Sequence, residues 1–171
     1  WREDFASHLA DGYKFDGTFE PHDARSNVSA SGSMDTTIDD QARMWRGMLM
    51  GAGLSPVMRA EWTRPQVPIT TKSKFPTIQV LGTYDPIGPR VHLAGGLGVD
   101  TWQGPSGQFF AKGGHNDWTG NIAQCDEANK RCVVLLGNDV RAELIYPAIV
   151  TMVLGDNSYP WAWTYPDLFA K

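Results

Sequence analysis

Apolar residues at helical spacing predict two helices in the first third of the chain. Between Thr37 and Gly51 the apolar positions recur every three or four residues, as on the buried face of a helix. Thr37 suits the N-cap of this helix and Gly51 suits its end. A shorter helix is predicted from Val57 to Trp62, with Ser55 as its cap. The predicted core positions of the first helix are Ile38, Ala42, Trp45, Met48 and Leu49.

In the second half of the chain the pattern changes to short apolar runs separated by turn residues. Such runs predict strands, and consecutive strands joined by short turns pair as an antiparallel meander. The four predicted strands span residues 92–102, 107–112, 119–125 and 132–136.

The ends of the chain carry weaker patterns. Residues 1–12 read as a short amphipathic helix that stops at Gly12, and residues 13–33 read as a loop. A C-terminal helix is predicted over residues 140–154, and Pro147 is expected to kink it. The aromatic tail at 159–166 is too irregular for a helix, and we expect it to pack on the body of the protein.

Together these elements predict an α+β fold. Residues 1–64 are mainly helical, and residues 65–89 form a proline-rich surface loop with one short strand at 77–81. Residues 90–137 form the antiparallel strands, and residues 138–171 form the C-terminal helix and tail.

Composition narrows the class of protein. The 171 residues suffice for one domain with a sizeable core. A net charge of -4 without clustered Lys and Arg excludes a nucleic-acid surface. No apolar run is long enough to span a membrane. The chain opens on Trp1 rather than Met, so we expect a further segment upstream of it.

The two cysteines flank a six-residue charged stretch. If Ala128 and Asn129 form a turn, Glu127 faces Lys130 and Cys125 lies opposite Cys132. That register permits a cross-strand disulfide in an oxidising compartment, which would favour a periplasmic or secreted location. The alternative is a pair of reduced thiols. Two cysteines without a nearby histidine do not make a metal site.

On one predicted strand a lysine is followed directly by two glycines. Lys112 follows the apolar run at 109–111, and Gly113 and Gly114 follow Lys112. Glycines let a ligand or another backbone come close. A cation beside exposed backbone N–H groups suits an anion or a developing oxyanion. The alternative is a lysine at the edge of the sheet, whose charge prevents another strand from pairing with the strand end.

The chain has no self-contained nucleophile motif. Gly-x-Ser-x-Gly, His-Glu-x-x-His and Ser-x-x-Lys are all absent from the sequence. The run Thr71-Lys72-Ser73-Lys74 has a hydroxyl at the right distance from a lysine, but it lies in a proline-flanked loop rather than on a helical turn.

Three stretches carry a family resemblance: residues 31–42, residues 96–99 with 109–118, and residues 132–139. They resemble the C-terminal part of the serine β-lactamase-like hydrolases, which include class C β-lactamases, penicillin-binding proteins and family VIII esterases. In that family a Lys-Thr-Gly, His-x-Gly or Trp-Gly-Gly triplet lies on the strand that edges the active site. Lys112-Gly113-Gly114 occupies that place here.

The resemblance implies the β-lactamase-like (DD-peptidase/transpeptidase-like) fold, with this chain as its C-terminal portion. Lys112 would be the cation that orients substrate, and the backbone N–H of His115 would donate to the oxyanion hole. Asn116 would lie at the rim as a substrate contact. Gly113 stands where β-lactamases usually carry threonine, which tilts the expected substrate from β-lactams toward esters, amides or D-amino peptides.

The same resemblance implies partners. The serine nucleophile, its paired lysine and the tyrosine of the second motif are expected in the upstream segment, so the 171 residues alone would be inactive. Acyl transfer on that serine needs no metal or organic cofactor. The alternatives are a non-catalytic ligand-binding module and a penicillin-binding regulator of the same fold.

Overall fold

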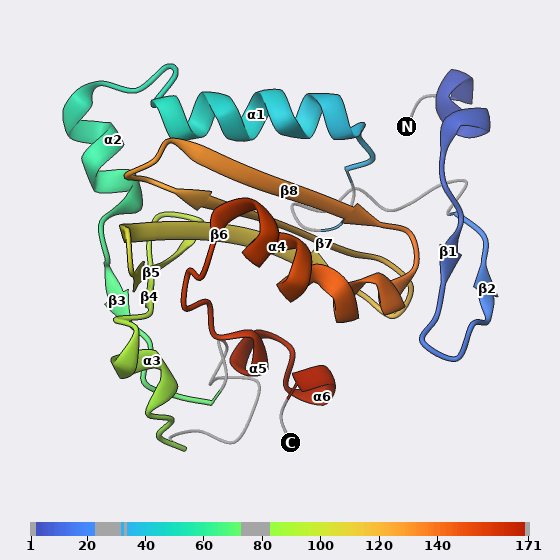
Figure 1. Cartoon of the computed structure of the whole chain (residues 1–171). Helices are drawn as coiled ribbons and strands as arrows, with labels where there is room; N and C mark the ends of the chain where they lie inside the picture. The colour runs from blue at the N-terminus through green and yellow to red at the C-terminus, as the bar shows by residue number, and fades with distance from the viewer. Residues whose placement is uncertain (1–2, 23–31, 33, 73–82, 170–171) are drawn as a thin grey trace.

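The computed structural model describes residues 3–22, 32, 34–72 and 83–169 and has the predicted α+β class (Figure 1). A six-stranded antiparallel sheet has the order β3-β4-β5-β6-β7-β8, and a separate hairpin pairs β1 with β2. The strands are β1 Gly12–Tyr13, β2 Phe19–Glu20, β3 Val67–Pro68, β4 Ala94–Gly95, β5 Asp100–Gly104, β6 Gly107–His115, β7 Gly120–Asp126 and β8 Arg131–Gly137. The α-helices are α1 Ile38–Met50, α2 Pro56–Thr63, α3 Ile87–Arg90, α4 Tyr146–Leu154, α5 Trp161–Thr164 and α6 Pro166–Phe169, and the 3-10 helices are η1 Glu3–His8 and η2 Val140–Ile145.

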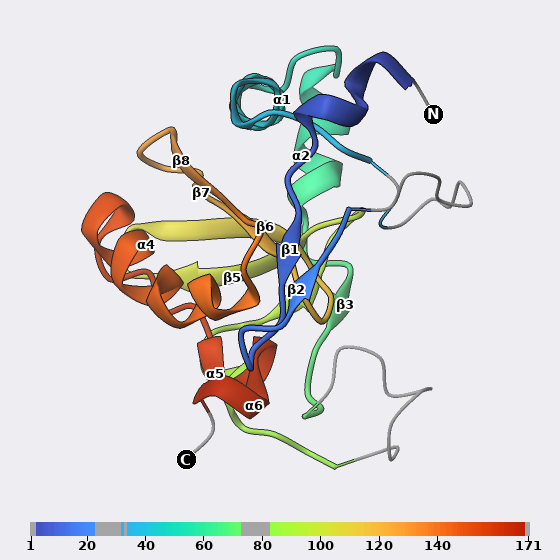
Figure 2. The same cartoon turned by 90° about the vertical axis from the view of Figure 1, so that its right-hand side faces the viewer.

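Helices cover both faces of the large sheet (Figure 2). On one face, Trp45 and Leu49 of α1 pack with Phe110 of β6 in a buried cluster. On the other face, Val150 of α4 packs on Val133 of β8. Because side chains alternate between the two faces of a strand, both faces of β6 and β7 can be apolar only when both are covered.

The two predicted helices before the sheet are confirmed. The Thr37 hydroxyl accepts from Asp40 N at the start of α1, and Gly51 ends this helix in the left-handed conformation. Ser55 caps α2 by accepting from Met58 N. Of the five predicted core positions of α1, Trp45 and Leu49 are buried and Met48 is half-buried. The other two, Ile38 and Ala42, are exposed, so the prediction was wrong for the first half of the helix.

The β7–β8 hairpin has the register that the sequence predicts. Cys125 lies opposite Cys132, and the structure joins them by a disulfide. Lys130 Nζ lies 2.8 Å from Glu127, as expected from the charge pattern. Asp126, although opposite Arg131, instead accepts hydrogen bonds from Asn129.

Reduction of the disulfide is expected to lower the free energy of unfolding by about 2–3 kcal/mol, the loop-entropy term for so short a ring. Urea unfolding with and without reductant measures this loss. The double variant Cys125→Ala/Cys132→Ala is the control, because its stability should not respond to reductant. An equal response of both proteins would show that the disulfide is not the cause.

The N-terminal prediction was wrong in part. Glu3–His8 form a 3-10 helix, η1, and not an amphipathic α-helix that continues to Gly12. The predicted loop contains the β1–β2 hairpin, whose turn is closed by a hydrogen bond from Lys14 N to Thr18 O. Lys14 also lies 2.9 Å from Glu20 across this hairpin. The ladder has only two residue pairs, Gly12 with Glu20 and Tyr13 with Phe19, which is too short for an apolar alternation to show in the sequence.

The strand predicted over 92–102 is two strands. A tight reversal, in which Gly96 N donates to Val99 O, separates β4 from β5, and Gly98 in it has a φ of 81°. Within the predicted loop at 65–89 the structure has β3 and α3, which the sequence did not indicate. The strand predicted at 77–81 lies outside the described residues.

The C-terminal region is more regular than predicted. The predicted helix at 140–154 starts as the 3-10 helix η2, and Pro147 lies in the first turn of α4, where proline is tolerated, so it does not kink the helix interior. The tail forms α5 and α6, so the prediction of an irregular tail was wrong. The expectation that it packs on the body is confirmed, because Trp163 and Tyr165 are buried.

Candidate functional site

The end of β6 has an open side. Strand β5 pairs with β6 only as far as Asp100 opposite Ala111. Beyond that point β6 continues through Lys112 to His115 and pairs only with β7 on its other side. Within the part of the chain that the structure describes, no strand occupies the β5 side of these four residues.

Two backbone N–H groups face that open side. Gln108 O accepts from Glu127 N, and Asn116 N donates to Thr119 O, so the even-numbered residues of β6 direct their peptide groups toward β7. Peptide groups alternate in direction along a strand. The N–H groups of Gly113 and His115 therefore face away from β7, into the space that β5 no longer fills.

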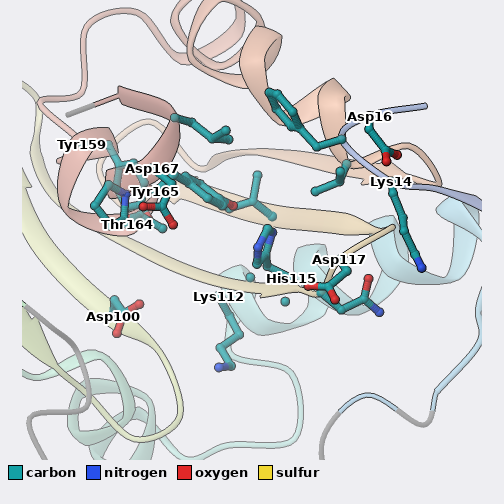
Figure 3. Close-up of a pocket in the computed structure, with 18 residues that line it drawn as sticks. Lys14, Asp16, Asp100, Lys112, His115, Asp117, Tyr159, Thr164, Tyr165 and Asp167 are labelled. Carbon is teal, nitrogen blue, oxygen red and sulfur yellow. Dashed lines mark hydrogen bonds between the residues drawn. The ribbon is translucent and has the colours of Figure 1, made fainter. Parts of the chain in front are cut away.

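A cavity of about 1040 Å³ lies over this end of the strand. Its floor is the Lys112-Gly113-Gly114-His115 segment, and its walls come from the C-terminal tail and from the β1–β2 hairpin (Figure 3). Tyr159 and Tyr165 give one wall aromatic character. The cavity thus joins segments from both ends of the chain on the single strand that the sequence singled out.

Lys112 and His115 leave opposite faces of β6. In Figure 3 the Lys112 ammonium points away from the His115 ring. Lys112 is exposed, and no described residue forms a hydrogen bond or ion pair with it. It also borders a second cavity of about 180 Å³, next to Gln41 and Trp45 of α1. An unpaired cation between two cavities is available to an anionic group of a ligand.

The neighbouring strand leaves little room for side chains at the two glycines of the triplet. A Cβ at Gly113 would come within 2.8 Å of Asn121 O, and a Cβ at Gly114 within 3.1 Å of Asn121 Nδ2. The first contact is closer than real Cβ atoms allow, so β7 accounts for the absence of threonine at position 113. The backbone that Gly113 lets come close is therefore that of β7, whereas Gly114 lies against the Asn121 side chain.

The His115 side chain is held by a buried carboxylate. Its Nδ1 lies 3.1 Å from Oε1 and 2.9 Å from Oε2 of Glu143, with hydrogen-bond geometry to Oε1. The His115 side chain is 52% exposed, whereas that of Glu143 is fully buried. The ring of Tyr165 meets the imidazole edge-to-face at 5.9 Å.

Burial raises the pKa of the Glu143 carboxyl, although hydrogen bonds from His115 and Tyr165 act in the opposite direction. Burial, with a smaller contribution from Glu143, raises the pKa of Tyr146 to about 12. Tyr146 therefore keeps its proton and donates to Gly120 O at 2.8 Å. These groups form a polar cluster beneath the end of β6.

Glu143 was not predicted from the sequence. The signal that could have found it is its spacing, since Val140, Glu143, Tyr146 and Val150 recur every three or four residues and are all buried. A carboxylate that is buried together with the rest of such a stripe requires a polar partner. Here that partner comes from a strand 28 residues earlier in the chain.

Replacing Gly120 by alanine is expected to lower the free energy of unfolding by about 1–3 kcal/mol, as overpacking does. Gly120 lies opposite His115, and its added Cβ would fall 2.2 Å from Glu143 Oε1. Urea unfolding measures the loss. Gly47→Ala is the matched control, because the added methyl in α1 would lie 3.7 Å from its nearest neighbour and should raise stability slightly. A neutral Gly120→Ala would contradict the close packing of Glu143.

Asn116 closes a turn. Its Oδ1 accepts from the backbone N–H groups of Trp118 and Thr119 and from the Thr119 hydroxyl. The residue lines the cavity, so a substrate contact through its Nδ2 stays a prediction. Asp117, the next residue, also lies on the rim.

Among the described residues no group of three His, Cys, Asp or Glu side chains could hold a metal ion. No helix in the described ranges is long and apolar enough to cross a membrane. Comparisons with protein-family models, with curated proteins and with solved structures found no significant match to this chain.

Proposed function

We propose that this chain is the C-terminal portion of a serine hydrolase with the β-lactamase-like fold. The enzyme would form an acyl-enzyme on a serine of an upstream segment and release the product by hydrolysis. Its layer order supports this: helices lie on both faces of an antiparallel sheet, with the last long helix, α4, on the face opposite α1.

The observation that carries the proposal is the open side of β6. It offers a cation, Lys112, and two outward N–H groups, those of Gly113 and His115, beside a large cavity. A tetrahedral acyl-transfer intermediate needs such donors at its oxyanion and a cation near its proton relay. The nucleophile would enter from the side that β5 leaves free.

The lack of a side chain at Gly113 favours some substrate classes over others. Because a side chain there would collide with Asn121 O, position 113 cannot supply the hydroxyl that binds a lactam carboxylate. Esters, amides or D-amino peptides are therefore the proposed substrates, ahead of β-lactams.

The test uses the longer polypeptide that contains this chain and its upstream segment. Intact mass is measured before and after exposure to a fluorophosphonate, which labels activated serines. One added probe per polypeptide, located by peptide mapping upstream of Trp1, is the expected result. A polypeptide that takes up no probe would overturn the proposal and leave Lys112 as a contact in a non-catalytic binding module.

A further inference from the structure

Of the two ring nitrogens of His115, Nδ1 forms a hydrogen bond with a described residue and Nε2 does not. Nδ1 is fixed by Glu143, and no described residue bonds Nε2, which lies on the opposite edge of the ring. The ring lines the cavity and is about half exposed. A histidine with one nitrogen anchored and the other open to a cavity is built to exchange a proton there.

Glu143 controls which nitrogen carries the proton. The Glu143 side chain is fully buried beside Nδ1. An ionised carboxylate can only accept, so next to ionised Glu143 a neutral His115 carries its proton on Nδ1 and its lone pair on Nε2. When Nε2 takes up a proton, the ring carries one proton on each nitrogen, and the carboxylate stabilises this imidazolium. Gly120 leaves the space that this carboxylate needs.

His115 and Lys112 lie on opposite faces of β6, with the two outward N–H groups between them. A carbonyl held by those N–H groups would therefore have the Lys112 cation on one side and the imidazole on the other. A water molecule beside His115 would approach the carbonyl from the face away from Lys112.

We propose that the His115 side chain, positioned by Glu143, is the general base that activates water for hydrolysis of the acyl-enzyme. This assignment rests on the proposed function. It gives His115 a second role, separate from that of its backbone N–H.

The step balances without a further reactant. The water oxygen bonds to the acyl carbon while one water proton moves to Nε2. The tetrahedral intermediate then collapses, the bond between the acyl carbon and the serine oxygen breaks, and the proton on Nε2 passes to the serine oxygen. The products are a carboxylic acid and the free serine.

The test compares His115→Ala with the wild-type long polypeptide, because alanine keeps the backbone N–H and removes the imidazole. Fluorophosphonate labelling and the burst of p-nitrophenol from p-nitrophenyl acetate report acylation. Steady-state turnover and the acetyl adduct seen by intact mass report deacylation. We expect unchanged labelling and burst, deacylation about 100-fold slower, and partial recovery with added imidazole.

Glu143→Gln tests the charge of Glu143 separately from its hold on the ring. The amide can still hold the ring but cannot stabilise the imidazolium, so deacylation should slow while acylation persists. His22→Ala is the matched control, since His22 also pairs with a carboxylate, 2.8 Å from Asp11, and is not among the residues that line the cavity. It should leave both steps unchanged.

The outcomes separate the two proposals. Two results with folded His115→Ala would overturn the role of His115 and leave the hydrolase proposal intact. One is deacylation at the wild-type rate. The other is that this variant loses labelling together with turnover. If His115→Ala does not fold, His115→Asn and Glu143→Gln carry the test with the same expectations. A wild-type protein that neither takes up the probe nor gives a burst would overturn the proposed function, and the role of His115 with it.

Discussion

Replacement of Lys112 by alanine is expected to lower ester hydrolysis by the long polypeptide about 100- to 1000-fold. Such a loss is typical when one preorganised electrostatic group that favours the transition state is removed from an otherwise intact site, and Lys112 is the cation near the proton relay. Lys112 is exposed and has no described partner, so the free energy of unfolding should stay within about 0.5 kcal/mol of the wild type. Steady-state turnover of p-nitrophenyl acetate, with urea unfolding alongside, measures both quantities.

Lys130→Ala is the matched control for this prediction. Lys130 is also an exposed lysine of the sheet region, but its ammonium pairs with Glu127 at the far hairpin. Its removal should leave turnover unchanged. Equal turnover in Lys112→Ala and Lys130→Ala would show that Lys112 only prevents other strands from pairing with the end of β6. The proposal of a hydrolase would then lose its main support.

Replacement of Trp102 by alanine is expected to lower the free energy of unfolding by about 3–5 kcal/mol. Trp102 is 1% exposed and stacks on Phe109 at a ring distance of 5.5 Å. Its Nε1 donates to Asn157 O at 2.7 Å. The substitution therefore opens a cavity between β5 and the tail and leaves a buried carbonyl without its donor.

Urea unfolding with the disulfide intact gives the loss directly. Met152→Ala is the control, because Met152 is 84% exposed on α4 and its truncation should change stability by less than about 0.5 kcal/mol. A similar small effect for Trp102→Ala would contradict the docking of the tail on β5. It would equally contradict the position of Tyr159 in the cavity wall, because the Tyr159 ring packs on Trp102 at a ring distance of 4.8 Å.

The helices before the sheet and the strands from Gly107 onward could be predicted because their signals are local. The Thr37 and Ser55 caps, the Gly51 stop and the charge pattern between the cysteines each act within a few residues. Helix caps and hairpin registers are decided at that range.

The elements that were missed depend on distant partners. The β1–β2 hairpin is held beside the sheet, where Tyr13 N donates to Asn138 O. The tail becomes helical against Trp102 and its neighbours. Contacts between residues this far apart in the chain leave no periodic trace in either segment, so the pattern could indicate burial of the tail but not its form.

The candidate site divides in the same way. The sequence by itself determined that Lys112 ends an apolar strand, that two glycines follow it, and that Cys125 faces Cys132, because each is a matter of neighbours and of one hairpin register. Only the tertiary structure decided that β5 stops at Asp100, which opens the side of β6, and that Glu143 lies under His115. Strand ends and the partners of buried carboxylates are fixed by packing between distant segments, and the spacing of residues along the chain does not reveal that packing.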